Sequence, residues 1–105
     1  MAKSKSYETV LLKSLSNQKE AIAYLNAALQ ECADGSPESQ KLLLMALKNV
    51  SLAHGSMQTL AQKTGLGRES LYKTLSKRGN PKLSTLTTII SALGFDLKVS
   101  LPAKR

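Results

Sequence analysis

The chain has 105 residues, of which 42% are hydrophobic, and carries a formal net charge of +8 at neutral pH. This length predicts one domain with enough apolar side chains to build its own core. The single cysteine excludes the disulfide-stapled secreted class and predicts a reducing, cytoplasmic location. The longest apolar run, Leu42 to Leu47, is too short to cross a bilayer, and we expect no signal peptide. Composition therefore favours a cytoplasmic protein with a polyanionic partner: nucleic acid first, and an acidic protein or a membrane surface after it.

Charge divides unevenly between the two halves of the chain. Residues 1–55 contain six lysines and five acidic residues, which gives +1. Residues 56–105 contain nine Lys or Arg and two acidic residues, which gives +7. A surface that faces phosphates needs clustered cations and few carboxylates, so we expect nucleic-acid contacts in the second half.

The N-terminal segment carries weak structural signals. We expect residues 1–6 to be disordered. Residues 7–15 can form a short amphipathic helix, with Val10, Leu11 and Leu15 as its apolar positions. The predicted domain organisation is a flexible segment over residues 1–16 with a possible short helix, followed by a single helical DNA-binding domain over residues 17–105.

Apolar periodicity and capping signals predict the helices that follow. They span residues 18–31, 37–53, 57–64, 68–76 and 83–93. Their N-terminal signals are Ser16 or Asn17, Ser36 followed by Pro37, and Ser56. Their C-terminal signals are the glycines Gly35, Gly55, Gly65 and Gly94, which can adopt the left-handed conformation that ends a helix.

The periodicity changes after Gly94. Phe95, Leu97, Val99 and Leu101 alternate with polar residues, as in a strand with one buried face. A lone strand leaves its backbone donors and acceptors unpaired, and no second strand is evident in the sequence. We therefore predict that these four residues form a homodimer interface with a second copy of the chain.

The most informative stretch, residues 57–77, has the spacing of a helix-turn-helix. Ala61 is small enough for two short helices to approach closely, and Gly65 permits the sharp turn that joins them. These offsets resemble the turn of the Cro and phage-repressor class, except that Thr74 stands where a large apolar residue is usual. The expected fold is all-α, with five to six helices around this Cro/repressor-like helix-turn-helix and one short C-terminal strand.

The second helix of the predicted helix-turn-helix, residues 68–76, has the side chains of a DNA-reading surface on its exposed face. The candidate DNA-binding residues are Gln58, Arg68, Glu69, Ser70, Tyr72, Lys73, Lys77 and Arg78. An arginine such as Arg68 can take guanine O6 and N7 in a fork, and lysines at positions such as Lys77 suit phosphates. A merely solvated basic face is the alternative, which the helix-turn-helix spacing disfavours.

Catalytic and metal chemistry find little support. His54 is the only histidine, and Cys32 has no partner at a metal-ligand spacing, so we expect no metal site and no cofactor. The stretch from Gly65 to Gly67 matches at most half of the glycine pattern of a dinucleotide-binding loop. We therefore expect a binding protein and not an enzyme.

Several segments together resemble the HigA-type addiction-module antidote proteins, over about residues 7–101. They are Tyr24-Leu25-Asn26-Ala27-Ala28-Leu29, Thr64-Gly65-Leu66, Arg68-Glu69-Ser70-Leu71-Tyr72, Leu75-Ser76, Gly79-Asn80-Pro81 and Ala92-Leu93-Gly94. Gly67 departs from the pattern, because a serine or asparagine is expected as the cap of the recognition helix.

The resemblance implies a DNA-binding antitoxin of a type II toxin–antitoxin module with an Xre-type helix-turn-helix. Such a protein neutralises a small RelE/ParE-like toxin and, as a dimer, represses transcription of its own operon. The near-neutral N-terminal region offers a surface for a basic toxin, with Glu8, Leu11, Leu12 and Leu15 as candidate contacts. Two alternatives remain open: a free-standing prophage-type repressor without a toxin, and an adaptor that binds an acidic protein.

Overall fold

The computed structural model describes residues 5–101, and this part of the chain is entirely helical apart from its connections. Six α-helices follow one another: α1 (Lys5–Leu15), α2 (Gln18–Glu31), α3 (Pro37–Ala53), α4 (Met57–Thr64), α5 (Arg68–Thr74) and α6 (Leu83–Ala92). A short 3-10 turn, η1 (Cys32–Asp34), lies between α2 and α3. The predicted all-helical class and number of helices are therefore confirmed.

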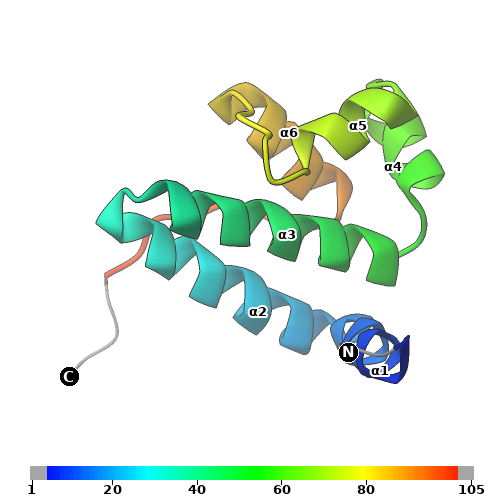
Figure 1. The fold of residues 1–105 in the computed structure, drawn as a ribbon, viewed down its shortest axis with the longest axis horizontal. Coiled ribbons are helices and arrows are strands. Elements are labelled where there is room, and N and C mark those ends of the chain that lie inside the picture. The colour runs from blue at the N-terminus through cyan, green and yellow to red at the C-terminus, as the bar shows by residue number, and fades with distance from the viewer. Residues whose placement is uncertain (1–4, 102–105) are drawn as a thin grey trace.

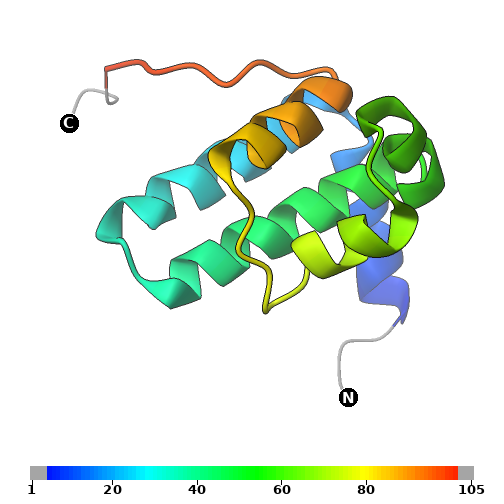
Figure 2. The same cartoon turned by 90° about the horizontal axis from the view of Figure 1, so that it is seen from above.

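Helix α3 lies at the centre of the arrangement. It packs antiparallel to α2 on one side, while α4, α5 and α6 lie on its other side (Figure 1). Helix α1 contacts both α2 and α3 and crosses the end of that pair, so that it is seen nearly end on in Figure 1. The charged second half of the chain is thus carried on a platform made by the first half (Figure 2).

Helix starts agree with the capping signals in the sequence. The Asn17 side chain accepts a hydrogen bond from the Glu20 backbone N–H at 3.1 Å, and the Ser36 hydroxyl accepts one from the Ser39 N–H at 3.2 Å. The Ser56 hydroxyl does the same for α4. Because each cap satisfies a backbone donor that lacks a partner within the helix, these boundaries follow from local chemistry.

Two boundaries differ from the predictions by two residues each, and α6 ends one residue early, at Ala92. Helix α1 begins at Lys5, within the segment expected to be disordered, whereas residues 1–4 lie outside the described part of the chain. Helix α5 ends at Thr74 and not at Ser76. The Ser76 hydroxyl donates to the Lys73 carbonyl at 2.7 Å and accepts from the Arg78 N–H, which closes the end of the helix. A side chain at Gly79 would also clash with the Thr74 carbonyl oxygen.

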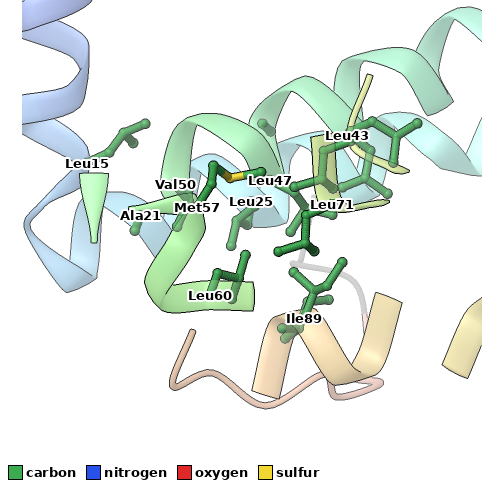
Figure 3. Close-up of a cluster of buried hydrophobic side chains, with 14 residues drawn as sticks. Leu15, Ala21, Leu25, Leu43, Leu47, Val50, Met57, Leu60, Leu71 and Ile89 are labelled. Carbon is green, nitrogen blue, oxygen red and sulfur yellow. The ribbon is translucent and has the colours of Figure 1, made fainter. Parts of the chain in front are cut away.

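One contiguous core joins all six helices. Its members include Leu15, Leu25, Leu47, Val50, Met57, Leu60, Leu71, Leu75 and Ile89. Side chains from α3, α5 and α6 meet where Leu47, Leu71 and Ile89 lie together, each with no exposed surface (Figure 3). The long α3 supplies the middle of this core, so the elements around it depend on α3 for their position.

Two apolar residues of α1 and α2 lie outside the core although helical spacing groups them with buried positions. Ile22 in α2 is 45% exposed and Val10 in α1 is 66% exposed. In α2, the half-buried Tyr24 packs against the core instead, and its hydroxyl accepts a hydrogen bond from the Asn49 amide at 2.9 Å. Helical periodicity alone does not define which edge of an apolar face is covered, because that depends on the neighbouring helix.

The predicted C-terminal strand is wrong. In the described chain, residues 95–101 carry no strand pairing and run as an irregular extended segment alongside α2 (Figure 2). Phe95 packs against the core, whereas Val99 and Leu101 are almost completely exposed. A strand requires a neighbour for its backbone hydrogen bonds, and the other described segments are committed to helices.

Candidate functional site

Helices α4 and α5 form a tightly joined pair. Gly65 adopts a left-handed conformation, with φ +76°, and its N–H donates to the Ala61 carbonyl at 2.9 Å. The Thr64 hydroxyl donates to the Leu60 carbonyl and accepts a bond from the Leu66 N–H. These bonds satisfy backbone carbonyl and N–H groups at the end of α4, and they fix the direction in which the chain enters α5.

The inner face of α5 holds this helix against the body of the protein. Leu71 has no exposed surface and Leu75, just beyond the helix, is 1% exposed. Residues four positions apart share one face of a helix, and both of these are buried. Because they fix one side of α5, its other side is presented in a defined orientation.

The outer face of α5 gathers several of the residues predicted to contact DNA. An open concavity of about 560 Å³ is lined by Glu69, Ser70, Tyr72, Lys73 and Ser76. Arg68, Lys77 and Arg78 are exposed at the two ends of the same region. Gln58 is exposed in the first turn of α4, outside the concavity. As Gly67 predicts, α5 has no side-chain cap at its N-terminus.

Two cations flank the ring of Tyr72. The Arg68 guanidinium carbon lies 6.0 Å from the ring centroid, and the Lys48 ammonium of α3 lies 5.7 Å from it. Both distances suit weak cation–π attraction. Lys48 was missed by sequence reasoning, because only the packing of α3 beneath α5 brings position 48 next to position 72. It adds a positive charge from the platform to the α5 surface.

A groove runs between α1, α3 and the end of α5. Its volume is about 360 Å³, and Glu8, Leu11 and Leu12 of α1 line it. These are three of the four residues predicted to bind a toxin. The fourth, Leu15, is 2% exposed and belongs to the core, so its predicted place on a docking surface is wrong.

His54 and Cys32 both make contacts within the fold. The His54 ring donates through Nε2 to the Leu15 carbonyl at 2.9 Å and meets the Phe95 ring edge-on at 5.7 Å between centroids. The Cys32 thiol donates to the Ser39 carbonyl at 3.5 Å, and burial raises the pKa of this thiol. Within residues 5–101 no three His, Cys, Asp or Glu side chains cluster to hold a metal ion.

Asp34 organises the connection between α2 and α3. Its carboxylate accepts hydrogen bonds from the Ser36 N–H and from the Ser39 hydroxyl, both at 2.8 Å. These bonds favour the ionised form and lower the pKa of Asp34 below its usual value. The cluster stabilises a turn and contains no nucleophile–base pair.

Comparison with known proteins identifies the family. Residues 5–101 match the family described as probable addiction module antidote protein. An uncharacterized protein of Haemophilus influenzae is 35% identical over 85 residues, which cover 81% of this chain and 80% of that protein. No solved structure matches the chain. None of the described helices is long and apolar enough to cross a membrane. With a match that spans all six helices, the chain belongs to the family of probable addiction module antidote proteins.

Proposed function

We propose that the protein is the antitoxin of a type II toxin–antitoxin module of the HigA type. In this role it binds a small RelE/ParE-like toxin and, through α4 and α5, the operator DNA of its own operon. Family membership supports the antitoxin role. The observation that carries the DNA-binding part is the outer face of α5, where exposed polar and basic side chains stand on a rigidly anchored helix.

In this proposal α4 and α5 act as a helix-turn-helix of the Cro/phage-repressor (Xre) class, with α5 in the major groove. Arg68 reads a guanine through its guanidinium fork, and Glu69 and Ser70 face neighbouring base edges. Tyr72 offers its hydroxyl to a phosphate or its ring to a thymine methyl. The outer cations and the first turn of α4 contact phosphates: Lys73, Lys77, Arg78 and Gln58.

Operator recognition requires two copies in this scheme. Two α5 helices about 34 Å apart would read a pseudo-palindromic site. Leu97, Val99 and Leu101 are exposed apolar residues on one segment, which supports self-association there. Replacing Val99 with Asp would place a charge in that contact. We expect the Val99→Asp variant to have the mass of a monomer in solution. A variant that is still dimeric would show that the interface lies elsewhere.

The first experiment is co-purification of the protein with the product of the adjacent gene. A stable complex with a small protein supports the antitoxin role, whereas recovery of the chain alone favours a free-standing repressor. DNA binding is tested separately by selecting duplexes from a random pool and measuring affinity at several salt concentrations. A groove reader prefers the selected site strongly and loses affinity steeply as salt rises. Equal, weak binding to all duplexes would defeat the DNA-binding proposal.

A further inference from the structure

The groove beside α1 combines an apolar floor with a charged rim. Leu11 and Leu12 come from α1, Met45 and Leu52 from α3, and Leu75 from the end of α5. Met45 is 40% exposed although it lies in the middle of the longest helix. A volume of about 360 Å³ is room for a few side chains of a docked helix.

Cations dominate the rim of this groove. Lys48 and Lys77 line it, and Glu8 is the one carboxylate among its lining residues. The charge of this groove therefore differs from the sequence-based expectation of a surface that suits a basic toxin. Lys48 is half-buried, so its aliphatic stem covers apolar surface while its ammonium stays near the ring of Tyr72. An occupant that matches both floor and rim needs apolar side chains on one face and carboxylates beside them.

These observations define one kind of ligand. We propose that the groove binds an amphipathic helical segment of the toxin, whose carboxylates pair with Lys48 and Lys77. This inference rests on the proposed antitoxin function and adds the place and the chemistry of the contact. A nucleic-acid strand fits less well, because phosphates gain nothing from the side chains of Leu11, Leu12 and Met45.

The same two lysines belong to the basic surface around α5. Lys77 lies three residues beyond the end of α5, and Lys48 lies over the ring of Tyr72, which lines the outer concavity. A toxin carboxylate at these ammonium groups would repel the phosphates that approach α5 and would neutralise the charge that attracts them. Toxin and DNA therefore bind with negative coupling, and each lowers the affinity of the other by the same factor.

The test uses the full chain, the purified product of the adjacent gene and a duplex of random sequence. Met45→Asp places a charge on the apolar floor, and Leu42→Asp is its matched control on an exposed part of α3 outside the groove. We expect Met45→Asp to weaken toxin binding about tenfold or more and to weaken DNA binding only slightly, through its charge near Lys48. Leu42→Asp should leave toxin binding unchanged. Circular dichroism confirms that both variants are folded.

Lysine variants test the shared contact. Lys48→Ala should weaken binding to both ligands and reduce the salt slope of DNA binding by about one, while Lys41→Ala on the same helix leaves both unchanged. Saturating toxin should lower DNA affinity in the wild-type chain and lower it less in the Lys48→Ala variant.

The outcomes separate this inference from the function on which it rests. If the Met45→Asp variant bound the toxin as tightly as the wild type does, the groove would not be the docking site. If saturating toxin left the DNA affinity of the wild-type chain unchanged, the two ligands would not be coupled. The antitoxin function itself would survive both results. It would fall, and the inference with it, only if the wild-type chain did not bind the adjacent gene product.

Discussion

Helices α3 and α5 differ in how many of their side chains are buried. Helix α3 has 17 residues and buries five apolar side chains, namely Leu43, Leu44, Ala46, Leu47 and Val50. Helix α5 has seven residues and buries only Leu71. The remaining surface of α5 carries the candidate recognition residues. The buried side chains that stabilise the fold are thus concentrated in α3 and the candidate recognition residues in α5, so each set can be perturbed separately.

The largest expected effect comes from the centre of α3. Leu47 has no exposed surface, so Leu47→Ala would leave a cavity among the helices that pack on α3. We expect a loss of about 2–5 kcal/mol in the free energy of unfolding, measured by urea denaturation. Leu42→Asp, on the exposed side of the same helix, should change it far less. Similar losses for both would contradict the assignment of the core to α3.

Helix α5 should show the opposite behaviour. We expect Arg68→Ala to cost about 1–3 kcal/mol of binding free energy on the selected operator and to relax base preference there. The matched variant Lys77→Ala should weaken binding to all duplexes alike, because a phosphate contact carries no sequence information. Both variants should have the same midpoint of urea denaturation as the wild type. Equal losses on operator and random DNA for both variants would refute this division.

A smaller effect is expected at the start of α4, which links the platform to α5. Ser56→Ala removes the cap that satisfies the Thr59 N–H and should cost about 1 kcal/mol of unfolding free energy. Ser91→Ala, on an exposed position of α6, serves as the control and should be nearly neutral. Thermal denaturation distinguishes the two. A Ser56→Ala variant as stable as the control would show that packing alone determines where α4 begins.

The smallest effect belongs to the turn before α3 and depends on pH. Because hydrogen bonds lower the pKa of Asp34 in the folded state, ionised Asp34 stabilises the fold above its unfolded pKa near 3.8. This contribution is lost as pH falls through the lower, folded pKa. Wild type should therefore be more stable than Asp34→Asn at pH 6, and the difference should shrink in acid. Urea titrations at several pH values measure it, and a constant difference would contradict the role of the charge.

Local chemistry explains which parts of the fold were predictable. Ser36 with Pro37, Ser56 and Gly65 each act within a few residues of their own position, so the starts of α3 and α4 and the turn after α4 could be read directly. The inward direction of Leu71 followed from helical spacing in the same way. Such signals need no knowledge of distant neighbours.

The parts that were missed depend on distant neighbours. Lys48 joins Tyr72 only after α3 and α5 pack together, and Leu15 is buried only because α1 crosses the ends of α2 and α3. The alternation from Phe95 to Leu101 has the correct period for a strand, but period alone supplies no pairing partner. Tertiary packing decides these features, and one sequence does not contain a local signal for it.

The anchoring of α5 through Leu71 and Leu75 has an evolutionary consequence. Since these two side chains hold the helix while Glu69, Ser70, Tyr72 and Lys73 face outward, mutations at the outward positions leave the core intact. In the proposed DNA-binding role, duplicated copies of the gene can therefore change their DNA preference by a few single substitutions while the fold stays intact. Paralogues in one genome can then come to bind different DNA sites after only a few mutations.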